Sequence, residues 1–310
     1  MATQTTQTAG LAPSIQTYYD KKLLARLLPM LFHQQFGQKR PIPKNGGKTI
    51  DFRKMQSLAP ATTPLVEGVT PSGNSVTMVS VTATPSQYGD YIEFSDVVDM
   101  VAIDPLVDES MDVLAEQAKD TIDRISRDVL AAGTSVQYAN GRVSRATIAA
   151  TDLLTVKEIR KARRTLKRNN VKPLEGGDYV AIIEPGTAYD LQDDPKWEEP
   201  VKYAGSTQIF NGEIGRIYGV RFVETTNAKK FPGAGASAID VYATLVLGKD
   251  AYGVVDVAGS GAVQTIVKPL GSSGTADPLN QRSTVGWKTM FTAKIIEQAA
   301  MVRIEHAVSQ

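Results

Sequence analysis

The stretch Asp104–Gly133 constrains the fold most, because it has the pattern of one long amphipathic helix. Asp104 is placed to accept a hydrogen bond from a first-turn N–H, and Pro105 sits where a missing backbone donor costs nothing. Gly133 provides a stop. The apolar residues fall on a single face at helical spacing: Met111, Leu114, Ala118, Ile122, Ile125 and Val129.

A helix of this length spans roughly 40 Å, whereas the mean globular helix has only about 11–12 residues. Its apolar face follows the 3.6-residue period and not the strict heptad of a coiled coil. We therefore expect a strut that packs one side against the rest of an α+β fold.

The composition excludes several classes of function. The chain has 310 residues, 42% hydrophobic and 22% charged, as in a globular protein of one elaborate domain or two lobes. A net charge of +1 gives no global attraction for nucleic acid. The absence of cysteine excludes disulfides, thiolate nucleophiles and cysteine-based zinc sites. There is no apolar run of about 18 residues and no signal peptide at residues 1–14, so we expect a cytosolic origin.

The sequence pattern in the first third of the chain predicts an apolar arm followed by a β ribbon. Strand patterns occur at 49–55, 76–83 and 91–94, and the residues between the first two are rich in Pro, Gly and Thr. A two-stranded ribbon is marginal alone in water, so we expect other copies of the chain to complete it. The arm, over 18–36, is helical in pattern and interrupted by Pro29, with apolar residues at regular intervals: Tyr19, Leu23, Leu27 and Leu31.

The second half predicts an α/β lobe that begins with a helix over Thr151–Asn170. One face of this helix is apolar and the other is basic, which allows two interpretations. The basic face is either a phosphate-contacting surface or a solvated face whose late positive charges suit the helix C-terminus. The basic residues are Lys157, Arg160, Lys161, Arg163, Arg164, Lys167 and Arg168.

The rest of the lobe alternates strands and turns, and long strands with a bend at 297–299 close the chain. A short helix is expected over 187–191, and a hinge-like loop over 271–277. The expected strands are 179–183, 216–223, 241–247 and 251–257.

No motif indicates an enzyme, a cofactor or a metal. His33 and His306 have no neighbouring triad pattern and are expected to be structural. Gly46-Gly47-Lys48-Thr49 ends like a phosphate-binding loop, but a strand pattern follows it where a helix is required. An acidic group lacks both a histidine and the calcium-loop register, and is expected to be solvated: Asp193, Asp194, Glu198 and Glu199.

Three segments resemble the N-four-like podophage family of tailed-phage major capsid proteins. They are Ile42–Pro71, Gln87–Asp96 and Gly286–Ala307, and the order of parts between them is also similar. This resemblance implies the Hong Kong 97 type α+β fold. It divides the chain into an N-terminal arm (1–45), an extended E-loop (46–95), a peripheral domain with the spine helix (96–149), an axial domain (150–260) and returning peripheral strands (261–310).

The resemblance implies a major capsid protein that assembles as pentamers and hexamers into an icosahedral shell around double-stranded DNA. A separate scaffolding protein, a portal and a decoration protein are the expected partners; the virion is the expected location, with assembly in the host cytoplasm. Expected contacts between subunits involve Leu27, Phe36, Phe52, Arg53, Leu65 and Glu67. Expected DNA-facing residues are Arg160, Arg163, Arg164 and Lys167.

Three alternatives stay open at this point. An encapsulin-like shell would share the fold but hold protein cargo in place of a genome. An α/β-lobed enzyme with a dimerising β arm would need an arrangement of polar catalytic residues that the sequence does not reveal. A nucleic-acid-binding module built on the basic helix would be more basic and would carry aromatic residues for stacking.

Overall fold

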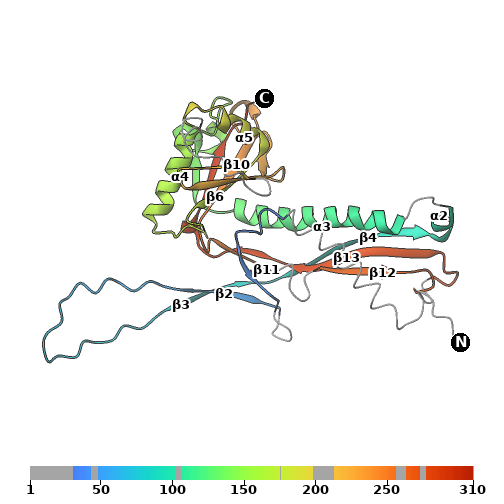
Figure 1. Ribbon diagram of the computed structural model, residues 1–310, viewed down its shortest axis with the longest axis horizontal. Coiled ribbons are helices and arrows are strands. Elements are labelled where there is room, and N and C mark those ends of the chain that lie inside the picture. The colour runs from blue at the N-terminus through green and yellow to red at the C-terminus, as the bar shows by residue number, and fades with distance from the viewer. Residues whose placement is uncertain are drawn as a thin grey trace.

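The computed structural model describes residues 31–42, 48–101, 106–174, 176–197, 213–255, 263–272 and 277–309. Figure 1 shows an elongated molecule with three parts: a lobe at the top, a long helix lying over long strands, and a two-stranded ribbon that extends away from both. Of the predicted features, the helical arm before residue 31, Asp104 with Pro105, Glu198 with Glu199, and most of the 271–277 loop lie outside the described residues.

The long helix is α3, Leu106–Ala131, and it confirms the predicted strut. Its apolar side is buried as the spacing predicted, with Met111, Leu114, Ala118 and Ile122 each at most 2% exposed. Ile125 and Val129 pack against the same core while partly exposed. The helix ends at Ala131, and the Gly133 N–H then donates to the Leu130 carbonyl oxygen.

Beneath α3 lies a sheet of β12 (Val263–Lys268), β13 (Arg282–Phe291) and β4 (Ser86–Ser95), in that order among the described strands. A short helix, α2 (Asp96–Val101), follows β4. Trp287 of β13 is buried against α3 and donates from its indole N–H to the Gln117 side chain at 3.1 Å. This layer of helix on sheet forms the larger core of the chain.

The upper lobe is built on a sheet that runs β5-β15-β10-β6-β8-β7 in the described part of the chain, with β9 also pairing to β10. Two helices, α4 (Val156–Arg168) and α5 (Pro185–Gln192), belong to the lobe. The strands are β5 (Val136–Tyr138), β6 (Tyr179–Ile183), β7 (Glu213–Ile217), β8 (Val220–Glu224), β9 (Lys229–Phe231), β10 (Val241–Leu247) and β15 (Met301–His306).

Two predictions about this lobe were wrong in detail. The segment 151–155 precedes α4 and is not helical, because the buried Asp152 carboxylate accepts the Ala149 N–H and holds a turn there. The single strand predicted at 216–223 is two antiparallel strands, β7 and β8. Tyr218 and Gly219 both have positive φ, 49° and 69°, which closes a two-residue hairpin turn.

The ribbon consists of β2 (Ile50–Met55) and β3 (Met78–Ala83), paired antiparallel from Ile50–Ala83 to Met55–Met78. The predicted third segment of the ribbon, 91–94, instead belongs to β4 and pairs with β13 in the sheet under α3. A small sheet of β1 (Gln38–Arg40), β11 (Tyr252–Val255) and β14 (Ala293–Ile295) lies at the base of the ribbon.

Short 3-10 helices complete the described structure. The last of them, η6 (Gln298–Ala300), separates β14 from β15 and is the bend predicted near residues 297–299. The Glu297 carboxylate caps it by accepting the Ala299 N–H. The others are η2 (Ala139–Gly141), η3 (Arg145–Thr147) and η4 (Ala236–Ala238).

Candidate assembly surfaces

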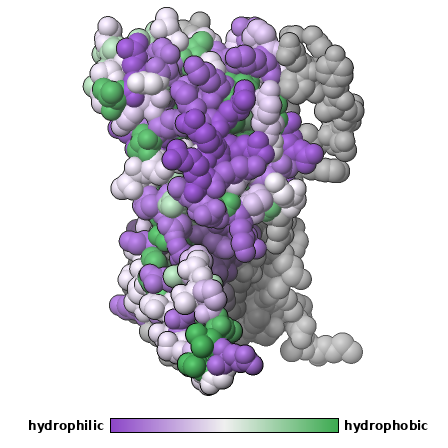
Figure 2. Space-filling view, turned by 90° about the vertical axis from the view of Figure 1, so that its left-hand side faces the viewer, coloured by the Kyte–Doolittle hydropathy of each residue, from purple (hydrophilic) through white to green (hydrophobic). Residues whose placement is uncertain are grey.

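The connection between β2 and β3, residues 56–77, is exposed at every position. Its apolar side chains therefore remain in solvent, and Leu65 at 77% and Val66 at 68% are among the most exposed. In Figure 2 a hydrophobic cluster marks the lower end of the molecule, on the side toward which this connection extends in Figure 1. An exposed apolar group of this kind indicates a surface that meets a partner.

The base of the ribbon, by contrast, is fixed to its own chain. Phe52 is 0% exposed and its ring lies directly over Gly253 of β11. Lys54 forms an ion pair with Glu297 beside η6. The ribbon is thus anchored at one end and free at the other.

The residues predicted to contact a neighbouring subunit are exposed in some cases and buried in others. Arg53, Leu65 and Glu67 are exposed, as a contact with a neighbour requires. Phe52 belongs to the core of its own chain, because β2 alternates and turns that side chain inward, so we remove it from the contact set. Phe36 is half-buried under the Arg221 guanidinium, 5.6 Å from the ring centroid, and Leu27 lies outside the described residues.

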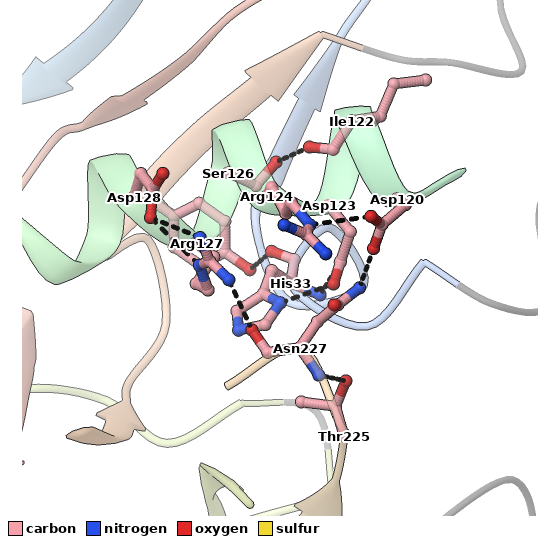
Figure 3. A network of polar contacts seen from close by, with 11 residues as sticks. His33, Asp120, Ile122, Asp123, Arg124, Ser126, Arg127, Asp128, Thr225 and Asn227 are labelled. Atoms are coloured by element: carbon pink, nitrogen blue, oxygen red, sulfur yellow. Dashed lines mark hydrogen bonds and ion pairs between the residues drawn. The ribbon is translucent and has the colours of Figure 1, made fainter. Parts of the chain in front are cut away.

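A buried polar network attaches the segment before β1 to α3 (Figure 3). Asp123 is 0% exposed and accepts two hydrogen bonds from His33, from the backbone N–H at 2.8 Å and from Nδ1 at 2.9 Å. The Tyr252 hydroxyl donates to the His33 carbonyl oxygen at 2.5 Å. His33 is therefore structural, as predicted, and it connects three separate parts of the chain.

The same network joins α3 to the upper lobe. The Asn227 amide donates to Asp120 at 2.8 Å, and Lys229 pairs with Asp128 at 2.9 Å. Arg127 donates to the Asn227 carbonyl oxygen at 3.3 Å. Figure 3 shows Asp120, Asp123 and Arg127 on successive turns of α3, facing Asn227 in the loop that precedes β9. The orientation of the lobe on α3 is thus set by polar contacts as well as by the core.

The basic face predicted from the sequence is present on α4. Arg163 is half-buried, and Arg160, Arg164 and Lys167 are exposed, so the structure brings all four predicted residues to one surface. Figure 2 shows a broad hydrophilic area over the upper lobe on the side where α4 lies in Figure 1. A fifth residue, Arg168, joins them to line a hollow of about 340 Å³, although only its basic character pointed to it in the sequence.

The second histidine is also structural. His306 is 0% exposed in β15; its Nδ1 donates to the Ala307 carbonyl oxygen at 2.8 Å, and its Nε2 accepts from the Thr244 hydroxyl at 2.9 Å. Burial lowers the pKa of His306 to about 4, so the ring is neutral at pH 7. Beside it, Glu305 is buried and accepts hydrogen bonds from Arg145 and Arg303.

The described residues contain no cluster of three or more His, Cys, Asp or Glu side chains that could hold a metal. The acidic residue Asp194 has a structural role, because its carboxylate accepts the first free N–H of α4, that of Val156, at 3.1 Å. Within the same described ranges, no helix combines the length and apolar character needed to cross a membrane.

Comparison with protein families identifies the chain. The model of the phage capsid protein family matches residues 78–304, from the first residue of β3 to within β15. This chain belongs to the phage capsid protein family. One curated relative, the major capsid protein of Escherichia phage T5, is 34% identical over 71 residues, 23% of this chain. The match spans only 15% of that relative's length. The N-four-like subtype is not identified by these matches and stays a prediction.

Solved capsid structures show that the fold is of the Hong Kong 97 type, as the resemblance implied. The capsid of Ralstonia phage GP4 superposes with a TM-score of 0.68 at 14% identity, covering 89% of this chain and 86% of that one. The cyanophage Pam1 capsid gives 0.65 at 16% identity, with 92% of each chain covered. An encapsulin of Synechococcus elongatus gives 0.55 at 8% identity, covering 99% of this chain and 92% of that one.

Proposed function

We propose that this family member is the major capsid protein of a tailed phage, and that its copies form the icosahedral shell that encloses a double-stranded DNA genome. The exposed connection of the ribbon is the observation that carries this proposal. A chain that keeps several large apolar side chains of one long connection in solvent is incomplete alone, and identical neighbours that dock head to tail in closed rings complete it.

We propose the same assignment of segments to the parts of the fold that the resemblance implied. Residues 1–45 serve as an arm, 46–95 include the E-loop, 96–149 and 261–310 form the peripheral domain, and 150–260 form the axial domain. Pentamers and hexamers arise when axial domains meet at the symmetry axes. The contact set is Leu27, Phe36, Arg53, Leu65 and Glu67, without Phe52.

The partners in this proposal follow from the shell. A separate scaffolding protein guides assembly, a portal occupies one vertex, and a decoration protein binds outside. The chain itself has a structural role and is not an enzyme. Assembly takes place in the cytoplasm of the host bacterium.

Negative-stain electron microscopy and sedimentation of the purified chain, alone and with its genomic neighbours, test the shell directly. Closed particles or discrete pentamers and hexamers are expected. A species that is strictly monomeric or dimeric under every assembly condition would contradict the proposal. Nucleic acid inside purified particles separates a phage head from an encapsulin-like compartment, which the shared fold alone does not distinguish.

A pair of variants tests whether the apolar side chains of the β2–β3 connection are needed for assembly. Leu65→Asp with Val66→Asp should abolish particles while the free energy of unfolding of the unassembled chain changes by less than about 0.5 kcal/mol, because both side chains are already in solvent. Ser72→Asp with Ser75→Asp adds the same charge to the same connection without removing apolar surface. That control should assemble; a control that also fails to assemble would refute a role for the apolar side chains.

A further inference from the structure

Among the described residues, those that line the hollow on α4 are all basic. Four arginines and one lysine surround it: Arg160, Arg163, Arg164, Lys167 and Arg168. They gather on one side of the last three turns of the helix, although the whole chain carries a net charge of only +1. The local field is therefore strongly positive on a chain that has no global field.

Two of these side chains are held in place by the turn between β7 and β8. The Arg160 guanidinium lies over the Tyr218 ring, 5.1 Å from its centroid. Arg163 rests against Gly219, where a Cβ atom would come within 3.0 Å of its Nη2. The Arg163 Nε is buried and has no hydrogen-bond partner in the structure. The hollow is thus partly preorganised, which reduces the entropy cost of binding a ligand.

None of the five forms an ion pair with a carboxylate in the part of the chain that the structure describes. The neighbouring Lys161, which does not line the hollow, is instead paired with Glu158 at 2.7 Å. Unpaired like charges at helical spacing repel one another, and an anion that binds among them relieves this repulsion.

The chemistry of the lining selects the class of anion. Protein interfaces have apolar cores depleted in charge, and no apolar side chain from the described ranges of the chain lines this hollow. Guanidinium groups bind phosphate oxygens in a bidentate manner, and several in a row match a backbone that repeats its charge. We propose that this hollow binds the phosphodiester backbone of DNA without sequence preference, with Arg160 and Arg163 as the preorganised contacts.

This inference relies on the proposed function only for the source of the DNA, which would be the packaged genome. Binding by the unassembled chain is a separate measurement, so either proposal can fail without the other.

Fluorescence anisotropy of a short labelled DNA duplex with the full-length unassembled chain tests the site. If four of the five lining cations each contact one phosphate, affinity should fall roughly 100-fold between 50 and 200 mM salt. Arg163→Gln with Arg164→Gln should weaken binding about tenfold or more at low salt and reduce the salt slope by about 2. Lys249→Gln with Lys294→Gln removes equal charge from exposed sites elsewhere and should change affinity less than about twofold.

The half-buried Arg163 has packing contacts, so Arg164→Gln with Lys167→Gln provides a second pair in which both side chains are exposed. Circular dichroism confirms that each variant is folded. The proposal is overturned if both charge-removing pairs on α4 bind DNA as well as the control does. It is also overturned if they keep DNA binding and instead lose self-association by sedimentation, since a second copy would then occupy the hollow.

Discussion

Gly253 of β11 should not tolerate a side chain, because the Phe52 ring, which anchors the ribbon, fills the space above Gly253. A Cβ atom built at Gly253 would lie 2.2, 2.4 and 2.5 Å from Cε1, Cδ1 and Cζ of Phe52. Nonbonded carbon atoms prefer roughly 3.5–4.0 Å, so the ring must move by about 1 Å or leave its site.

The expected loss of unfolding free energy depends on whether the Phe52 ring shifts within the core or leaves it. Overpacking that the core absorbs costs about 1–3 kcal/mol, and loss of a buried phenylalanine ring costs about 3–5 kcal/mol. Gly253 does not have positive φ, so alanine adopts its backbone and regains about 0.4–1 kcal/mol through the unfolded state. Gly253→Ala should therefore lower the free energy of unfolding by about 1–4 kcal/mol.

Urea unfolding of the unassembled chain, followed by circular dichroism, measures this change. Gly73→Ala is the matched control, because Gly73 lies in the exposed connection with no atom within 4 Å of the added Cβ. Its effect should stay within about 0.5 kcal/mol.

A double-mutant cycle isolates the contact. Phe52→Ala removes the ring that the methyl group added by Gly253→Ala would strike, so the double variant should be little less stable than Phe52→Ala alone. Additive losses, or a Gly253→Ala chain as stable as the Gly73→Ala control, would refute the proposed anchor.

Three further changes test the buried polar groups. His306 is neutral when folded and has a pKa near 4, so its contribution is present above pH 6.5 and is lost as the pH falls toward 4. Urea unfolding across this range should show a loss of roughly 3 kcal/mol that His306→Gln abolishes. Glu305→Gln leaves the buried Arg303 and the half-buried Arg145 without their carboxylate and should destabilise the chain by about 3–5 kcal/mol, measured by the same assay. Asp123→Asn removes the acceptor of the His33 ring and should cost about 1–3 kcal/mol. Hydrogen exchange should then show earlier opening of residues 31–42, and unchanged protection there would contradict the attachment.

Periodicity over neighbouring residues was enough to predict those helices and strands whose buried and exposed faces alternate regularly or are buried throughout. The apolar period of α3, the buried run of β6 and the alternation of β2 each depend on residues close in sequence, and the structure confirms all three. The basic face of α4 was visible for the same reason, because residues three and four apart share a helix face. The resemblance to capsid proteins rested on three segments and on the order of parts between them, both of which are visible in the sequence.

Other features depended on partners far apart in the chain. Asp123 reads as one more polar residue of a long helix until His33, ninety residues earlier, is placed against it. Phe52 was expected to contact a neighbouring subunit because the resemblance places it in the E-loop, whereas the structure shows its ring over Gly253, in the core of its own chain. The hairpin at Tyr218 and Gly219 was missed because residues 216–223 read as one apolar strand.

The sequence by itself therefore determined an α+β chain with a one-sided strut, a two-stranded ribbon too marginal to be stable alone, and a basic helix. Only the tertiary structure decided which end of the ribbon is anchored, and which cations share a hollow with the Tyr218 turn. The physical reason is that periodicity reports the polarity of a surface, whereas the identity of what covers that surface is set by long-range packing.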